Sequence, residues 1–263
     1  MKILFVVVIV LYAASVALQF AGAAFKKDKL LKASWLVFVA AFAVQSVFLV
    51  ARGVAAKRLP LSNQFEFSFA FAWGVALMLI ILRSRLKADW LSVAAMPMAL
   101  LILTYAALQP MEIRELMPAL RSAWFGVHIG SAVLSYASFV IAGSIGLRYV
   151  LMEKKHREED QKALRQMDYL SYRLVAFGFL FLTIVILSGA IWAEQAWSAF
   201  WTWDPKEVWA LITWIIYAVY LHLRLRKKHS GVKMAWFLII AVPVVFFTFA
   251  GVNTLLPGLH SYG

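Results

Sequence analysis

Tryptophans are concentrated in one short segment of the chain, residues 192–209. Five of the eleven tryptophans of the protein fall there: Trp192, Trp197, Trp201, Trp203 and Trp209. Indole rings favour the lipid–water boundary, so one interpretation is an aromatic belt. A belt spreads aromatic residues over all helix ends, whereas here a single segment holds nearly half of the tryptophans. A second interpretation, a platform that buries a planar ligand, therefore stays open.

The order of residues in this segment predicts two local structures. The spacing i, i+3, i+4 of Trp197, Phe200 and Trp201 predicts a short helix on the membrane surface, with the three rings on one flat apolar face. The residues from Asp204 to Glu207, DPKE, predict the start of another helix. Asp is a favoured N-cap, Pro suits the first helical position, and Glu at the third can reach back to the cap amide. We expect this quartet to fix the angle at which the aromatic segment leaves the helix.

Three of the five histidines are candidate metal ligands. His128 lies just inside the outer end of an apolar stretch, His260 lies outside near the C-terminus, and His222 lies near the inner end of another apolar stretch. His156 and His229 lie in charged segments and are interpreted as surface residues. A single histidine at a membrane boundary is usually structural. Two outer histidines flanking a Trp-rich segment favour ligation of a haem iron by neutral imidazole.

His222 cannot share an iron with the two outer histidines. The fifteen residues from Glu207 to His222 correspond to about 22 Å of helix at about 1.5 Å per residue. If all three histidines are ligands, there are two sites, and the inner site has one histidine from this chain. The chain contains no cysteine, so it forms no disulfide, supplies no thiolate and has no CxxCH motif.

The composition excludes a soluble enzyme, a nucleic-acid-binding module and a disordered chain. Of the 263 residues, 63% are hydrophobic and 15% are charged, against about 45–50% and about 25% in soluble domains. Eight apolar stretches are each long enough to cross a hydrocarbon core of about 30 Å as a helix. They are residues 3–24, 34–51, 66–82, 90–108, 124–152, 170–192, 207–223 and 234–253. The sequence therefore predicts an all-α, polytopic membrane protein.

The positive charge follows the connections between these stretches. The net charge is +13, and 19 of the 26 Lys and Arg residues lie in, or within five residues of, the connections that follow the first, third, fifth and seventh stretches. By the positive-inside rule those connections are cytoplasmic, while both termini and the Trp-rich segment are extracytoplasmic. The charge is thus a topology signal, and no nucleic-acid partner is expected. The charged run within residues 153–169 is most simply the solvated end of a helix that continues the fifth stretch.

One membrane domain is expected over residues 1–263, with residues 192–209 as an external loop between the sixth and seventh helices. The first stretch could be mistaken for a signal peptide. It lacks a small-residue cleavage pattern and runs directly into lysines, so we interpret it as a retained span.

Four segments of the sequence resemble the CcsA (ResC) family of cytochrome c biogenesis proteins. The tryptophan-rich WWD signature of that haem-handling group is similar to residues 192–222, which read WAEQAWSAFWTWDPKEVWALITWIIYAVYLH. The family's PLSN-x-x-E loop resembles residues 59–66, LPLSNQFE. The segments that hold the family's first and second outer haem histidines resemble residues 116–136 and 258–263.

The resemblance implies a role for each candidate residue. His128 and His260 would be the two axial ligands of an outer haem iron, and His222 would ligate an inner haem together with a histidine from a partner protein. The residues that would hold the outer porphyrin are Trp192, Trp197, Trp201, Trp203 and Asp204. The outer cations that could pair with the haem propionates, or that have only a topological or snorkelling role, are Arg58, Arg121 and Lys206.

The resemblance also implies a function. The chain would carry haem b without a covalent bond and present it on the outer face, as a subunit of a CcsA–CcsB type cytochrome c synthase. The implied partners are a CcsB (ResB) type membrane protein, a CxxCH apocytochrome c and a thioredoxin-like thiol reductant. The bacterial plasma membrane is expected rather than the thylakoid, because no transit segment is evident and the chain is short. The alternatives are a HemX-type haem-binding protein that regulates or supports haem synthesis, and a solute transporter in which the Trp segment is only a belt.

Overall fold

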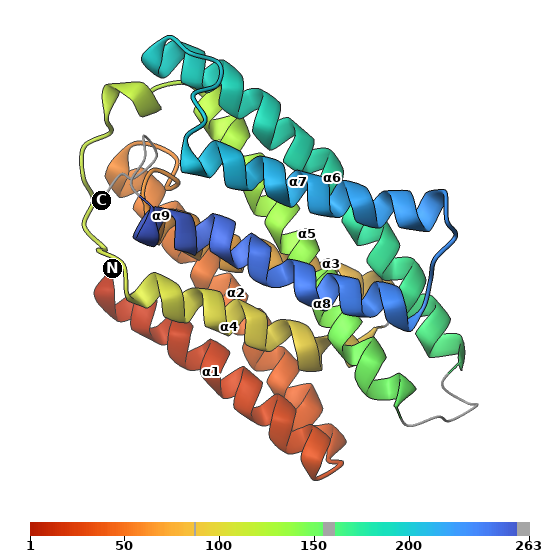
Figure 1. The fold of residues 1–263 in the computed structure, drawn as a ribbon. Coiled ribbons are helices and arrows are strands. Elements are labelled where there is room, and N and C mark those ends of the chain that lie inside the picture. Colours follow the sequence, from red (N-terminus) through yellow and green to blue (C-terminus); the bar gives the residue numbers. More distant parts are fainter. Residues whose placement is uncertain (87, 155–160, 257–263) are drawn as a thin grey trace. The chain divides into compact units, whose positions relative to one another are not determined.

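Long helices make up the chain, as the computed structural model shows for residues 1–86, 88–154 and 161–256. In these residues every regular element is a helix, and eight helices are long and apolar enough to cross a membrane (Figure 1). Helices suit this role because each backbone N–H and C=O is paired within its own segment. The prediction of an all-α, polytopic membrane protein with eight spans is confirmed.

The helices coincide with the apolar stretches of the sequence. Their bounds are α1 Lys2–Ala24, α2 Asp28–Ala56, α3 Gln64–Leu86, α4 Ser92–Ala107, α5 Ala123–Glu153, α6 Gln161–Trp197, α7 Pro205–Leu225 and α8 Val232–Phe246. Short 3-10 helices precede α4 and α5, namely η1 Asp89–Leu91 and η2 Pro118–Leu120. After α8 the chain continues through a π-helix, η4 Phe247–Gly251, into α9 Val252–Leu255.

The sequence made two predictions about where these helices begin or end, one for the start of α6 and one for the end of α5. α6 begins at Gln161, well before the apolar stretch that starts near residue 170, because its first turns carry polar residues as a solvated extension. The expected continuation of α5 into the charged run falls on residues 155–160, including His156. These residues lie outside the described part of the chain, in which α5 ends at Glu153.

The chain divides into two compact units, Met1–Glu115 and Leu116–Gly263. The first unit contains α1 to α4 and the second contains α5 to α9. The expectation of one membrane domain over residues 1–263 stays a prediction.

Buried polar side chains within the first unit pair with one another between helices. The Tyr12 hydroxyl of α1 donates to Oε1 of Gln45 in α2 at 2.6 Å, and Nε2 of Gln45 donates to the carbonyl of Phe69 in α3 at 2.9 Å. The chain of bonds lies beside a cluster of phenylalanine rings, in which Phe48 and Phe69 are 4.5 Å apart between centroids. Such pairing is needed because a hydrocarbon interior has no water to satisfy a polar group.

Small residues let the helices of the second unit approach closely. A Cβ at Gly146 of α5 would lie 2.8 Å from the carbonyl oxygen of Ala235 in α8, and a Cβ at Gly143 would overlap the side chain of Val242. Membrane helices commonly pack through such small residues, since van der Waals contact replaces the hydrophobic effect between them. The hydroxyls of Thr213 and Thr248, 2.9 Å apart, join α7 to the π-helix η4.

Replacing Gly146 by alanine tests this packing. The methyl group would meet the backbone oxygen of Ala235, so α8 must shift, and overpacking of this kind costs about 1–3 kcal/mol. Gly130→Ala is the matched control, because a Cβ at Gly130 has no neighbour within 4 Å. We expect Gly146→Ala, but not Gly130→Ala, to lower the midpoint of thermal unfolding in detergent. Equal midpoints would contradict the packing.

Candidate functional site

The side chain of His128 is held in a defined orientation near the start of α5. Its Nδ1 lies 2.8 Å from the backbone carbonyl oxygen of Val185 in α6. A carbonyl oxygen can only accept a hydrogen bond, so Nδ1 carries a proton and, in the neutral imidazole, Nε2 carries the lone pair. This is the tautomer of a metal-binding imidazole, whose other ring nitrogen usually donates to a carbonyl or carboxylate. The contact therefore suits His128 to the ligand role predicted for it.

Trp192 packs beside His128 rather than lying on the surface. The indole is 1% exposed, and its Nε1 donates to the carbonyl of Ala119 at 2.7 Å. Its ring centroid is 6.0 Å from that of the His128 imidazole, with 29° between the planes. Trp197 meets Trp192 edge-on, with centroids 4.9 Å apart. The structure thus brings together three of the predicted site residues, one from α5 and two from the end of α6.

A serine at the start of α5 adds another connection at this end of the unit. Ser122 is the N-cap of α5 and accepts from the backbone N–H of Trp124 at 3.2 Å, while its hydroxyl donates to Oε1 of Gln195 in α6 at 2.7 Å. The first turn of α5 is therefore fixed to the last turns of α6. Because His128 lies in the following turn, these contacts also support its position.

The prediction of a surface helix that aligns Trp197, Phe200 and Trp201 is wrong. α6 ends at Trp197, and residues 198–204 form no helix. Ser198 ends α6 in the left-handed conformation, with φ of 57°. The Glu207 carboxylate then binds the backbone N–H of Thr202, at 2.8 Å. This bond competes with helical hydrogen bonding, and the segment is a loop without helical structure.

The capping box predicted from Asp204, Pro205 and Glu207 is confirmed. Asp204 accepts from the backbone N–H of Lys206 at 2.9 Å, and Glu207 accepts from the backbone N–H of Asp204 at 3.2 Å. Pro205 occupies the first position of α7. The carboxylate of Asp204 is buried and caps the helix, so its demonstrated contact is with the backbone. The quartet anchors the aromatic loop to the N-terminus of α7.

Two indoles of the loop remain accessible. Trp203 is 70% exposed and has a positive φ of 60°. Trp201 is half-buried and lies perpendicular to it, with centroids 5.9 Å apart. A positive φ at a bulky residue is strained and persists only where the surroundings hold it. These two rings are the ones in the loop that a flat ligand could contact.

The three candidate outer cations have different surroundings. Nζ of Lys206 donates to Oδ1 of Asn253 at 2.7 Å and to the carbonyl of Phe249 at 3.3 Å, which ties α7 to the π-helix and α9. Arg58 is committed to a carboxylate, as described below. Arg121 is exposed. Lys206 and Arg58 therefore have structural contacts that a propionate role would have to share.

The structure describes His222 but not His260. His222 is exposed in the last turn of α7. Close to it, Arg224 pairs with Asp168 of α6 at 2.8 Å and fixes this end of the helix. His260, with the whole of residues 258–263, lies outside the described part of the chain. The pairing of His128 with His260 therefore stays a prediction.

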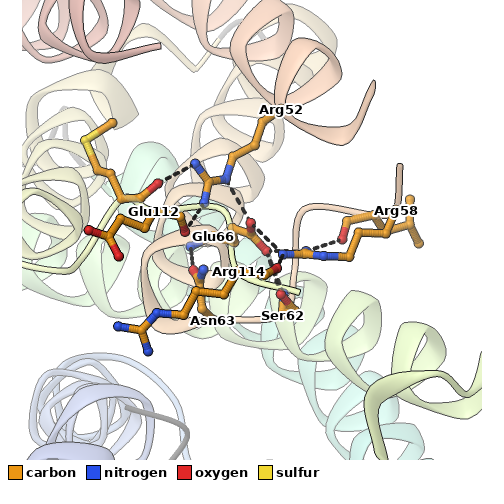
Figure 2. Close-up of polar contacts among 9 residues, drawn as sticks. Arg52, Arg58, Ser62, Asn63, Glu66, Glu112 and Arg114 are labelled. Carbon is orange, nitrogen blue, oxygen red and sulfur yellow. Dashed lines mark hydrogen bonds and ion pairs between the residues drawn. The ribbon is translucent and has the colours of Figure 1, made fainter. Parts of the chain in front are cut away.

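A buried carboxylate lies at the start of α3 in the first unit. Glu66 is 0% exposed and accepts from Nε of Arg52 and Nη1 of Arg58, each at 2.8 Å (Figure 2). The backbone N–H of Ser62 donates to the same carboxylate at 2.8 Å, and Oδ1 of Asn63 accepts from the N–H of Glu66 at 2.8 Å. The residues that resemble the PLSN-x-x-E loop thus form a closed polar cluster.

The two arginines of this cluster also hold a second segment of the chain. Arg52 donates to the carbonyls of Met111 at 2.8 Å and Glu112 at 3.2 Å, and Arg58 donates to the carbonyl of Arg114 at 3.4 Å (Figure 2). These carbonyls belong to the connection that follows α4. The Glu66 carboxylate therefore fixes, through two guanidinium groups, the point at which the chain leaves the first unit.

Sequence reasoning missed this cluster as a physical unit. A signal was present, because Arg52 interrupts an apolar region and Glu66 opens the next apolar stretch. A charge inside a membrane segment is costly unless it is paired, so an arginine and a glutamate at such positions predict an ion pair. The carbonyl acceptors could not be found in this way, because they carry no residue-type signature.

Glu66→Gln tests the cluster, with Glu112→Gln as the matched control. Removing one partner of a buried ion pair costs about 3–5 kcal/mol, because the remaining charge is left uncompensated. The side chain of Glu112 is exposed, and that residue contributes only its carbonyl. We expect Glu66→Gln to lower the unfolding midpoint and to open residues 109–115 to proteolysis. Identical stability and cleavage in the two variants would count against the cluster.

The known proteins that are similar in sequence to this chain are cytochrome c assembly and biogenesis proteins. The family model described as Cytochrome C assembly protein matches residues 61–260. Cytochrome c biogenesis protein CcsA of Guillardia theta is 34% identical over 244 residues, which cover 83% of this chain and 81% of that protein. Its namesake in Chlamydomonas reinhardtii is 37% identical over 227 residues, covering 82% of this chain and 64% of that protein.

A solved structure shares the fold. The chain aligns with Cytochrome c Heme Lyase CcmF at a TM-score of 0.70 and 12% identity, over 94% of this chain and 46% of that one. This chain thus spans about half of the heme lyase, and at such low identity the likeness concerns the fold alone. The family match and the sequence relatives support a role in cytochrome c maturation. The chain is a multi-pass membrane protein that belongs to the CcsA family of cytochrome c assembly proteins.

Proposed function

We propose that this chain carries haem and presents it for attachment to apocytochrome c, as a subunit of a CcsA–CcsB type cytochrome c synthase. The observation that carries the proposal is the Nδ1 contact of His128 with the carbonyl of Val185. It supplies an imidazole in the tautomer that ligates iron, beside the buried ring of Trp192. Haem b is the proposed cargo, bound without a covalent bond.

The outer site proposed here uses two imidazoles. His128 supplies one, and His260 is proposed for the other on the basis of the family resemblance. Two axial imidazoles saturate the iron, which blocks oxygen binding and sets the reduction potential. The exposed indole of Trp203 and the half-buried indole of Trp201 are the proposed contacts for the porphyrin face. Among the described residues, no three His, Cys, Asp or Glu side chains converge as a site for a bare metal ion.

Attachment would use the reactivity of the haem itself. Each thiol of a CxxCH segment adds across one vinyl group: the sulfur bonds to one vinyl carbon and the thiol proton passes to the other. The addition is balanced without an external oxidant, provided that a thioredoxin-like partner keeps the thiols reduced. The histidine of CxxCH would displace one of the two imidazoles. The chain's contribution is therefore mainly to position the reacting groups.

An inner site is proposed at His222. This imidazole is exposed in the last turn of α7, which suits a ligand that is completed by another protein. A CcsB (ResB) type membrane protein is the proposed partner and would supply the second histidine. The distribution of Lys and Arg supports a cytoplasmic position for this end and an extracytoplasmic position for both termini. The proposed location is the bacterial plasma membrane.

Removal of both outer imidazoles tests the outer site. We expect the wild-type chain, purified with its CcsB-type partner, to carry six-coordinate haem with a bis-imidazole absorption spectrum. His128→Gly combined with His260→Gly should abolish the outer-site spectrum, and added imidazole should partly restore it. An unchanged spectrum in the double variant would refute the ligand assignment. Bound haem that is never transferred to a CxxCH peptide would favour the HemX-type alternative.

His222→Ala tests the inner site. We expect it to reduce haem loading of the complex several-fold while the unfolding midpoint stays near that of the wild type. His229→Ala is the control, since this exposed histidine follows the same helix and contributes only its backbone to the Arg224 contacts. Undiminished loading in His222→Ala would show that this histidine is structural.

A further inference from the structure

We propose that Gly189 of α6 is a positioning residue for the His128 imidazole. The inference rests on the proposed function for its consequences at haem, but the contact itself is independent of any ligand. A Cβ built at Gly189 would lie 2.7 Å from Nδ1 and 2.9 Å from Cε1 of His128. The imidazole therefore occupies the space in which a side chain at this position would stand.

The register of α6 explains why this position must be glycine. Val185, Gly189 and Trp192 follow one another at i, i+4 and i+7 and lie on one face of the helix. A helix carbonyl points toward the residue four positions later and has a second lone pair after its helical bond is made. The Nδ1 proton of His128 uses that lone pair of Val185 at 2.8 Å. It reaches the oxygen across the bare backbone of Gly189.

Two of the contacts of His128 orient the ring. The hydrogen bond to Val185 holds the Nδ1 edge, and the indole of Trp192, 6.0 Å away at 29°, lies along the face. Together they fix the direction of the Nε2 lone pair. A methyl group at Gly189 would push the ring away from the carbonyl and so change both its direction and the donor at Nδ1.

Other helical glycines of the second unit have a different neighbour. Gly146 faces the backbone of α8, and Gly178 faces the ring of Phe139, with a Cβ at 2.7 Å. These are contacts of helix packing. Gly189 faces an imidazole instead. This singles it out as a residue that acts on the site.

The test is a mutant cycle in the haem-loaded complex with the CcsB-type partner. We expect Gly189→Ala to release outer haem about tenfold or more faster than wild type, as outer-shell changes typically do. A high-spin fraction should appear and should be reversed by added imidazole. Gly130→Ala, whose Cβ meets nothing within 4 Å, should behave as wild type. In the His128→Gly background rescued by imidazole, Gly189→Ala should have no further effect.

Three outcomes would overturn the proposal. The first is that Gly189→Ala and Gly130→Ala release haem at the same rate. The second is that Gly189→Ala changes haem release equally with and without the His128 ring. The third is that added imidazole does not reverse the high-spin fraction of Gly189→Ala. If Gly189→Ala alone fails to accumulate, the double variant with His128→Gly removes the clash and should accumulate. Failure of both would assign Gly189 to helix packing.

Unfolding measurements separate this proposal from the proposed function. Gly189→Ala should lower the unfolding midpoint when His128 is present and should not lower it in the His128→Gly background. This result requires no haem. If the wild-type complex binds no outer haem but the unfolding cycle behaves as stated, the proposed function fails while the positioning of His128 by Gly189 stands.

Discussion

A membrane interior offers no water to a polar group, so each buried donor, acceptor and charge in this protein needs a partner within the protein. Glu66 meets this requirement with two arginines, and those arginines use their remaining donors on backbone carbonyls of the connection after α4. His128 meets it with the carbonyl of Val185. The same constraint that stabilises the helices therefore also determines the orientation of the polar residues that could act chemically.

The orientation of His128 links local packing to function. Because its partner is a helix carbonyl, the ring presents its proton at Nδ1, which in the neutral imidazole is the tautomer proposed to ligate iron. Because the carbonyl is reached across Gly189, the position of the ring depends on a residue with no side chain. The aromatic loop adds a second fixed element, since Glu207 binds its backbone at Thr202 and Asp204. An oriented imidazole and a loop held by Glu207 both suit the proposed binding of haem.

Sequence patterns predicted the features that depend on neighbours along the chain. The eight apolar stretches became the eight long helices, and Asp204 to Glu207 formed the capping box, because hydropathy and capping act over a few residues. The prediction of a short helix over Trp197 to Trp201 was wrong, because Glu207 binds the loop backbone. The spacing of three aromatic residues contains no information about that competing contact. The role of Gly189 and the carbonyl contacts of Arg52 depend on which helices meet. Neither could be derived from one sequence.

The central claim is that two histidines of this chain ligate one iron on the outer face. Electron–nuclear double resonance of the ferric complex tests it directly when this chain alone carries ¹⁵N-labelled histidine and the partner is unlabelled. The account predicts one iron with two labelled axial nitrogens and a second iron with one. Detection of at most one labelled nitrogen at every iron would contradict it.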